Sequence, residues 1–214
     1  VNELTVRQDN SVQWVWSNTA NYSIDLGKNN ISAVIGTEAK KENGEHLQGY
    51  GRGLVIEDLD YRYLDTVTEG KSVSNNASTY AMVSYFGKVN YAFDDKYLIS
   101  GTVRRDASSR FGKGNNSAIF PSVSAGWRVS REKFMECTQN WLSDLKLRAS
   151  WGINGNDQID NNATYNLYYT NMSNGSYNFN GDGTTVLPGV QKDRSGNNDL
   201  KWEETKQLNF GIDA

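Results

Sequence analysis

The fold of this chain is decided by residues 80–153, which read YAMVSYFGKVNYAFDDKYLISGTVRRDASSRFGKGNNSAIFPSVSAGWRVSREKFMECTQNWLSDLKLRASWGI. Four runs within this stretch alternate between apolar and polar residues. In the first run, for example, Ser84 stands between Val83 and Tyr85 in the sequence. Because successive side chains of a strand point to opposite faces, each run predicts a strand with one apolar and one polar face.

The length of these runs separates two kinds of β protein. Each run has about ten residues or more, whereas strands of soluble sheets usually have about five or six. A strand that crosses a bilayer at a tilt needs about nine to eleven residues. Four long runs, each with one apolar face, therefore predict strands of a membrane-spanning barrel.

The composition agrees with such a barrel and excludes other classes. Hydrophobic residues make up 37% of the 214 residues and the mean hydropathy is −0.68. Barrel strands carry apolar residues only at alternate positions, so their summed hydropathy resembles that of a soluble protein. The net charge of −3 argues against a nucleic-acid partner, which would require a basic patch. The single cysteine, Cys137, excludes an internal disulfide.

The same alternation predicts three further strands outside residues 80–153. We expect an all-β fold, an antiparallel up-and-down meander of about seven long strands joined by two long loops. The expected strands cover about 14–26, 31–41, 80–93, 96–106, 118–130, 142–153 and 204–214, and the long loops cover 43–78 and 154–203.

The connections between these strands fall into two groups. In an antiparallel meander every second connection lies at the same end of the sheet. Outer-membrane barrels have short periplasmic turns at one end and long external loops at the other, with aromatic residues at the interfaces. The sequence matches both features, with short connections at 27–30, 94–95 and 131–141, long ones at 43–78, 106–118 and 154–203, and Tyr91, Phe93, Tyr97 and Trp127 near the short ones.

Several segments resemble the SusC/RagA family of TonB-linked outer-membrane proteins. They follow one another in the family's order and are specific over about 80–156 and 197–214, whereas the long loops carry no resemblance. The segments are RRDASSRFG at 104–112, FPSVSAGWR at 120–128, WLSDLKLRASWGINGN at 141–156 and LKWEETKQLNFG at 200–211.

The resemblance implies a segment of a twenty-two-stranded transmembrane barrel in the bacterial outer membrane of Bacteroidota. Such proteins import oligosaccharides or peptides with energy delivered through TonB, and they pair with a SusD-like surface lipoprotein. The sequence contains neither the family's N-terminal plug domain nor its TonB-binding segment, and it stops inside an alternating run. We therefore expect a fragment that contacts lipid through its barrel wall, with TonB engaging an N-terminal part that is missing here.

Four cations occupy polar positions of the expected strands. In the family's barrel this face lines the lumen, where the cations would pair with carboxylates of the plug or border a wet interior. The simpler interpretation is solvated or salt-bridged charges without a specific ligand. The four residues are Arg104, Arg128, Lys146 and Arg148.

The long loops are rich in tyrosine among Asn, Asp and Gly. Flat rings beside amide and carboxylate groups suit sugar recognition, because rings stack on apolar sugar faces while hydroxyl groups find polar partners. The competing interpretation is that these rings pack the loops onto themselves. The candidate ligand-binding residues are Tyr50, Tyr61, Tyr63, Tyr165, Tyr168, Tyr169 and Tyr177.

No convergent set of reactive groups predicts an enzyme. His46 is the only histidine and lies in an expected polar loop, far in sequence from Cys137. Asp157, Asp160 and Asp182 offer oxygen ligands, but their spacing does not match an EF-hand loop. We expect no catalysis and no cofactor, with calcium in the external loops left open.

Two other hypotheses remain at this point. A soluble, secreted β-sandwich carbohydrate-binding module would bury one face of each strand against a second sheet and need no membrane. A chain cut from its barrel would expose two sheet edges and an apolar face, so the isolated fragment is expected to self-associate. The sequence does not name the substrate.

Overall fold

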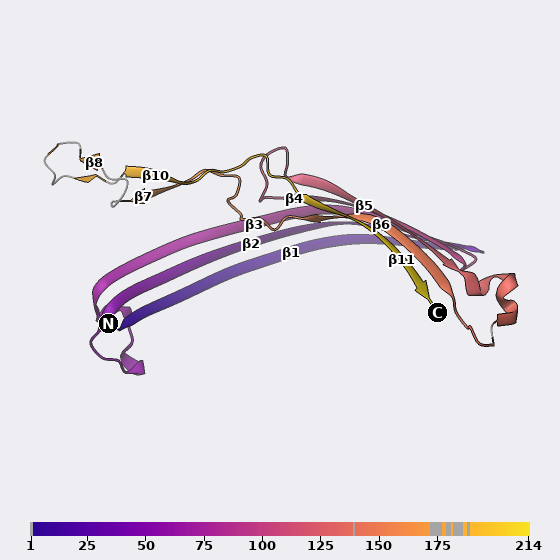
Figure 1. The fold of residues 1–214 in the computed structure, drawn as a ribbon, viewed down its shortest axis with the longest axis horizontal. Helices are drawn as coiled ribbons and strands as arrows, with labels where there is room; N and C mark the ends of the chain where they lie inside the picture. Colours follow the sequence, from indigo (N-terminus) through magenta and orange to yellow (C-terminus); the bar gives the residue numbers. More distant parts are fainter. Residues whose placement is uncertain (1, 139, 172–176, 179–180, 182–185, 188) are drawn as a thin grey trace. The chain divides into compact units, whose positions relative to one another are not determined.

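The computed structural model contains one large antiparallel sheet (Figure 1), and it describes all residues except 1, 139, 172–176, 179–180, 182–185 and 188. Seven strands lie in the order β1-β2-β3-β4-β5-β6-β11. This order confirms the predicted meander. The strands are β1 (Glu3–Leu26), β2 (Asn29–Leu54), β3 (Val67–Phe93), β4 (Tyr97–Ser108), β5 (Ser117–Arg128), β6 (Lys146–Asn156) and β11 (Glu203–Asp213).

Short elements occupy the connections. Four are 3-10 helices, and four are short strands that form two separate pairs, β7 with β10 and β8 with β9. Within the described residues, no helix has the length and apolar character needed to cross a membrane. The short elements are η1 (Leu59–Tyr61), η2 (Leu64–Thr66), η3 (Val129–Arg131), η4 (Lys133–Thr138), β7 (Leu167–Asn171), β8 (Tyr177–Asn178), β9 (Val186–Leu187) and β10 (Gly189–Arg194).

The first three strands are much longer than predicted. The expected loop 43–78 is wrong, because β2 continues to Leu54 and β3 begins at Val67. The strand expected at 14–26 likewise begins at Glu3. Much of the added length of β1 and β3 is exposed on both faces, so polar residues suffice there and no apolar alternation marks the strands.

The later boundaries differ less from the predictions. β6 begins at Lys146 rather than at 142, and the expected loop 154–203 holds the short strands β7 to β10. The turn between β3 and β4 has two residues with positive φ, Asp94 (51°) and Asp95 (57°). Such a pair matches the twist of a two-residue hairpin, and aspartate tolerates this conformation better than most residues.

The chain divides into two compact units, and each is described by itself. The first comprises Val1–Val15 and Lys40–Ala81, and the second comprises Trp16–Ala39 and Met82–Ala214. In the first unit the Asn2 side chain exchanges two hydrogen bonds with the Leu54 backbone, at 3.0 and 2.9 Å. Polar side chains, rather than an apolar core, therefore join the ends of β1 and β2 there.

The described sheet has almost no interior. Its buried apolar residues are few and scattered, and no second sheet covers the described strands as in a sandwich. The β-sandwich alternative is therefore not supported. The buried apolar residues are Val67, Tyr80, Phe111, Phe120 and Val129.

Candidate functional site

In the second unit, the backbone register aligns apolar residues of five strands on one face, which we call the apolar face. Directly opposed residues of antiparallel strands share a face. Residues paired in succession from β3 to β4, β5, β6 and β11 therefore form one row across the sheet. The row nearest the short turns contains Phe93, Tyr97, Trp127, Leu147 and Ile212; the next contains Tyr91, Ile99, Ala125, Ala149 and Phe210; the third contains Val89, Gly101, Val123, Trp151 and Leu208.

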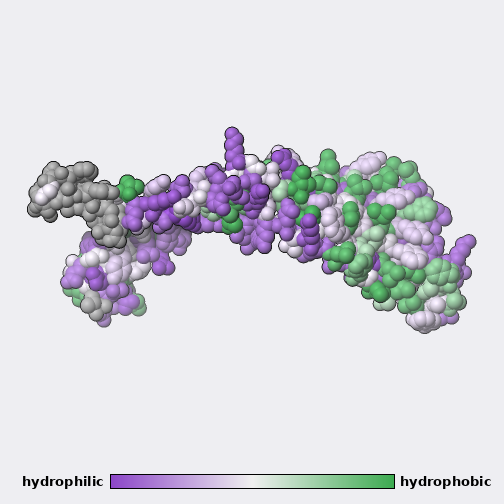
Figure 2. Space-filling view, turned by 45° about the horizontal axis from the view of Figure 1, so that its top comes forward, coloured by the Kyte–Doolittle hydropathy of each residue, from purple (hydrophilic) through white to green (hydrophobic). Residues whose placement is uncertain are grey.

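The large side chains of the apolar face are exposed. Ile99 is 57% exposed and Phe210 is 77% exposed. Figure 2 shows hydrophobic side chains gathered at the end where β4 to β6 and the short turns lie. A continuous apolar surface of this kind marks contact with another apolar medium or partner, because water disfavours it.

The alternate positions of the same strands form the opposite, polar face. One row consists of Asn90, Ser100, Ser124, Ser150 and Asn209. The hydroxyl oxygens of Ser100 and Ser124 lie 2.7 Å apart, and Asn90 Nδ2 donates to Ser32 Oγ at 3.0 Å. The side chains thus form hydrogen bonds with one another across strands, and the row is a hydrophilic, uncharged strip across the sheet.

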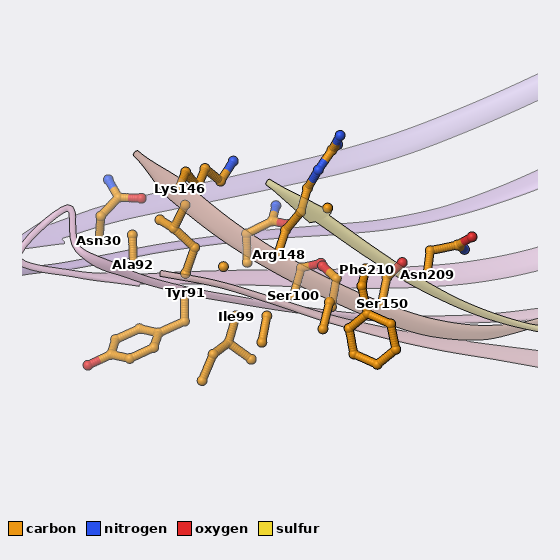
Figure 3. Close-up of a pocket in the computed structure, with 17 residues that line it drawn as sticks. Asn30, Tyr91, Ala92, Ile99, Ser100, Lys146, Arg148, Ser150, Asn209 and Phe210 are labelled. Carbon is orange, nitrogen blue, oxygen red and sulfur yellow. The ribbon is translucent and has the colours of Figure 1, made fainter. Parts of the chain in front are cut away.

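A hollow of about 780 Å³ lies along this strip. In Figure 3, Lys146 and Arg148 project to one side of the sheet, whereas Ile99 and Phe210 project to the other. Arg148 forms an ion pair with Asp213 at 3.2 Å. The two cations lie among amide and hydroxyl groups, a set that can bind carboxylates or hydroxyl-rich molecules.

Arg104 lies on the polar face and forms its ion pairs within the sheet. Its Nε donates to both carboxylate oxygens of Asp106, at 2.8 and 3.0 Å, and its Nη2 donates to Ser84 Oγ at 2.8 Å. Ser84 and Asp106 are buried. The guanidinium also stands 3.7 Å from a carboxylate oxygen of Glu38 and over the Phe86 ring. This geometry matches the simpler interpretation of a salt-bridged charge for Arg104.

Arg128 is paired at the end of the sheet that holds the short connections. Its guanidinium lies 3.3 Å from Asp95, which also accepts a hydrogen bond from Arg131 at 2.8 Å. The register therefore places all four predicted cations on the polar face, three of them in ion pairs within the described chain. The fourth, Lys146, has no ion pair among the described residues.

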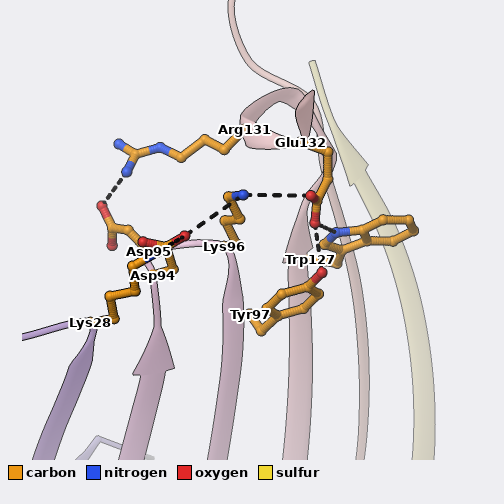
Figure 4. A network of polar contacts seen from close by, with 8 residues as sticks. All are labelled: Lys28, Asp94, Asp95, Lys96, Tyr97, Trp127, Arg131 and Glu132. Carbon is orange, nitrogen blue, oxygen red and sulfur yellow. Dashed lines mark hydrogen bonds and ion pairs between the residues drawn. The ribbon is translucent and has the colours of Figure 1, made fainter. Parts of the chain in front are cut away.

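A network of polar contacts ties together the connections β1–β2, β3–β4 and β5–β6, and we call it the turn network (Figure 4). Lys28 lies 3.3 Å from Asp94, and Lys96 lies 3.7 Å from Asp94 and 3.5 Å from Glu132. Glu132 also accepts hydrogen bonds from Tyr97 Oη at 2.6 Å and Trp127 Nε1 at 3.2 Å.

The environment of Glu132 favours its charged form. The Tyr97 hydroxyl lowers the pKa of this carboxyl most, the Trp127 indole lowers it further, and the Lys96 ammonium adds a smaller effect. Glu132 is therefore a carboxylate at neutral pH and holds the residues after η3 against the sheet. The sequence did not predict the turn network. A signal was available, because Tyr97 and Trp127 share a face and Glu132 follows in the next connection.

Residues of the recognised motifs meet at the other end of β4, β5 and β6. The rings of Phe111 and Phe120 each lie 5.3 Å from the Trp202 ring, and Trp202 Nε1 donates to the Asn116 carbonyl at 3.2 Å. The Phe120 ring also fills the space in which a Cβ at Gly155 would stand. These motif residues form a small aromatic cluster, so their role here is structural.

The acidic residues considered for calcium face arginines. Asp160 lies 3.0 Å from Arg194, and the Asn161 side chain accepts a hydrogen bond from Arg110 at 2.8 Å. The backbone N–H of Asn162 lowers the pKa of Asp160 most, followed by Arg194. Among the described residues, no group of three or more His, Cys, Asp or Glu side chains is arranged for a metal ion, and Asp182 lies outside them.

The predicted tyrosines divide between the two units. In the first unit, Tyr50 is half-buried in β2, whereas Tyr61 and Tyr63 are exposed in the connection between β2 and β3.

In the second unit, Tyr165 and Tyr168 are exposed, and Tyr169 Oη donates to Gln191 Oε1 at 3.1 Å. Tyr168 and Tyr169 are neighbours in β7, so their rings point to opposite faces. The Tyr177 side chain lies outside the described part of the chain.

The residues considered for catalysis belong to different units. His46 lies within β2 rather than in a loop and forms a hydrogen bond with Asp9 of β1. Cys137 is exposed in η4, in the other unit.

Comparison with known proteins gives one consistent family. The model of the TonB dependent receptor-like β-barrel matches residues 3–213. TonB-dependent receptor P26 of Formosa agariphila is 32% identical over 98% of this chain and 21% of its own length. TonB-dependent receptor SusC of Bacteroides thetaiotaomicron is 35% identical over 90% of this chain and 18% of its own length.

A solved structure gives the same result. The structure of the RagAB peptide transporter superposes with a TM-score of 0.83 at 32% identity, covering 98% of this chain and 22% of that chain. The chain therefore spans about a fifth of the length of the relatives that it matches.

Proposed function

The chain belongs to the TonB-dependent receptor-like β-barrel family, and from that premise we propose that it forms part of the wall of an importer in the bacterial outer membrane. The observation that carries this proposal is the register, which puts three consecutive rows of apolar side chains on one face and polar side chains on the other. In a membrane barrel the outward face is an apolar band and the interior is polar. The apolar face then borders lipid, and the polar face lines the lumen.

In this proposal the hollow on the polar face belongs to the path of the substrate. Lys146 and Arg148 provide positive charge beside Asn and Ser side chains, which suits peptides with carboxylates as well as oligosaccharides. The relative RagAB is a peptide transporter by its description. Tyr61 and Tyr63 of the first unit, and separately Tyr168 of the second, are proposed to contact substrate, because exposed rings stack on flat apolar surfaces at little cost in conformational entropy.

The partners follow from the complete receptor. We propose that a SusD-like surface lipoprotein covers the external loops and that TonB engages a part of the receptor outside these residues. We propose a transport role without catalysis or a bound cofactor for this segment.

The test compares neighbouring residues on opposite faces of the same strand. In the complete receptor in lipid bilayers, Val89→Cys and Val123→Cys should resist a water-soluble maleimide until the receptor is unfolded, because a thiol in hydrocarbon stays protonated and unreactive. The matched variants Asn90→Cys and Ser124→Cys should react with it in the folded receptor. Equal labelling of residues 89 and 90 by the water-soluble reagent would contradict a lipid-facing apolar side.

A further inference from the structure

The connection between β5 and β6 differs from the other two at the same end of the sheet. The other two are turns of a few residues, whereas this one runs from residue 129 to 145 and contains η3 and η4. We call it the connector. Its described residues include Phe134, which is 64% exposed, and Trp141, which is 75% exposed. The described chain does not cover these two large aromatic side chains, and they lie in the same connection.

The connector is fastened to the sheet next to the first row of the apolar face. Glu132 accepts hydrogen bonds from Tyr97 and Trp127, which oppose each other in the first row of the apolar face. The Tyr97 and Trp127 side chains reach Glu132 at the end of the sheet (Figure 4). Lys96, in the turn between β3 and β4, also pairs with Glu132 at 3.5 Å. Because η4 begins at the next residue, it starts at the end of the sheet, next to the first row of the apolar face.

Hydrogen bonds link the two ends of the connector, so the connector forms a closed loop. Ser130 Oγ donates to Asp144 at 2.8 Å, and the Ser130 N–H donates to the Leu145 carbonyl at 3.2 Å. These bonds join the two ends of the connector. Phe134 and Trp141 therefore lie on a loop of defined length next to the apolar rows.

The 3-10 geometry of η4 sorts its side chains by chemistry. In such a helix residues three apart lie above one another. Phe134 and Cys137 therefore share a side, and both are exposed. Met135 and Thr138 share another side and are half-buried, with Thr138 Oγ1 donating to the Met135 carbonyl at 2.8 Å. The charged Lys133 and Glu136 share the third side.

We propose that the connector is an interfacial anchor, with Phe134 and Trp141 inserted among the lipid head groups that border the short turns. This inference rests on the proposed function, because it requires lipid along the apolar face. Tryptophan prefers the membrane–water interface because its ring carries an N–H group. An amphipathic segment lies in that plane with its apolar side, where phenylalanine is common, turned inward. The exposed Lys133 suits contact with lipid phosphates. The continuity with the row of Tyr97 and Trp127 favours lipid over a protein partner.

Cys137 provides the reporter, since it shares the side of Phe134. In the complete receptor, with any other cysteines replaced, an environment-sensitive fluorophore on Cys137 is measured in bilayers of phosphatidylethanolamine and phosphatidylglycerol. Quenching is compared between lipids with a nitroxide at the head group, lipids with a nitroxide in the middle of the acyl chain, and aqueous iodide. We expect several-fold stronger quenching by the head-group nitroxide than for a probe at Lys113→Cys, which lies in the exposed connection between β4 and β5.

Two double variants test which side chains hold the probe there. Phe134→Ser with Trp141→Ser should reduce the head-group quenching to the level of the Lys113 control and raise quenching by iodide. Val55→Ser with Leu59→Ser also removes two exposed apolar side chains, from the connection between β2 and β3, and should leave the Cys137 signal unchanged.

The outcomes separate the anchor from the proposed function. Probes at Val89→Cys and Val123→Cys must be quenched by the mid-chain nitroxide, and their failure would overturn the lipid-facing sheet itself. If those probes are quenched but Cys137 responds only to iodide, the connector lies in water and the anchor is wrong. If Cys137 is shielded from both lipid nitroxides and iodide, another protein segment covers the connector and the anchor is also wrong.

Discussion

Gly211 and Gly155 are among the glycines over which a neighbouring side chain crosses the strand. The Arg148 side chain passes over Gly211 of β11, and the Phe120 ring lies over Gly155 of β6. The two neighbours differ in freedom. Arg148 has a flexible stem and a largely exposed side chain, whereas Phe120 is buried and packs against Trp202. The same added methyl group therefore meets a mobile obstacle at one position and a fixed obstacle at the other.

The two glycines form a matched pair for mutation. Gly155→Ala should destabilise the complete receptor by about 1–3 kcal/mol, because the buried ring has no free space into which it can shift. Gly211→Ala should change stability by less than about 0.5 kcal/mol, since the exposed arginine can move aside. Thermal unfolding in detergent, followed by circular dichroism, measures both. Equal effects would show that the ring over Gly155 is not a fixed obstacle.

At Arg104 the sequence predicted the face but not the partners. Alternation alone places Arg104 and Asp106 on the same side of β4. The third partner, Ser84, comes from β3, and the register that opposes Ser84 to Asp106 cannot be derived from either strand alone. A motif of arginine and aspartate two residues apart in a strand was the signal available for the pair.

At the scale of the element, a strand could be predicted where its two faces differ in polarity. Most predicted strand ends in 80–153 agree with the structure to within a few residues, because one face of each strand is apolar and the other polar. Over 69–79 of β3 both faces are exposed, and the sequence EGKSVSNNAST has no period-two signal. Backbone pairing with a neighbouring strand extends β3 there, and pairing between distant segments leaves no local pattern.

The connector should respond to acid through Glu132. Hydrogen bonds from Tyr97 and Trp127 and the charge of Lys96 hold the pKa of this carboxyl below its ordinary value, which is about 4.3. A lowered carboxyl pKa in the folded state gives stability that is complete above the ordinary value and is lost as the pH falls through the folded pKa. We expect faster amide hydrogen exchange in 129–145 in that range, after correction for the intrinsic effect of pH.

Two substitutions separate Glu132 from other acids of the connector. Glu132→Gln should loosen the connector at neutral pH and abolish the acid transition, because the amide cannot ionise. Glu136→Gln replaces an exposed acid of η4 and should keep the wild-type profile. An unchanged transition in the Glu132 variant would assign the acid sensitivity to another group.

At the scale of the whole molecule, a single sheet with an exposed apolar face is an incomplete structure. Seven strands in one layer leave β1 and β11 as edges, and the apolar rows on β3 to β6 and β11 have no cover in the described chain. The sequence predicted the single meander from the alternation of its runs, but not the lengths of the connections, because 129–145 between β5 and β6 is longer than 109–116 between β4 and β5. It could not predict the substrate path, because the loop tyrosines follow no pattern that fixes where their rings meet.

The residues of this chain produced alone should therefore self-associate in water. Open edges pair with other strands, and the apolar face adds a hydrophobic driving force. Size-exclusion chromatography with light scattering of residues 1–214 should show oligomers, and detergent should reduce their size by covering the apolar face. Phe210→Ser with Ile212→Ser removes exposed apolar groups from the edge strand β11 and should weaken association. Asn209→Ser, on the polar face of the same strand, should leave it unchanged, whereas a clean monomer of the unmodified segment in water would contradict the exposed apolar face.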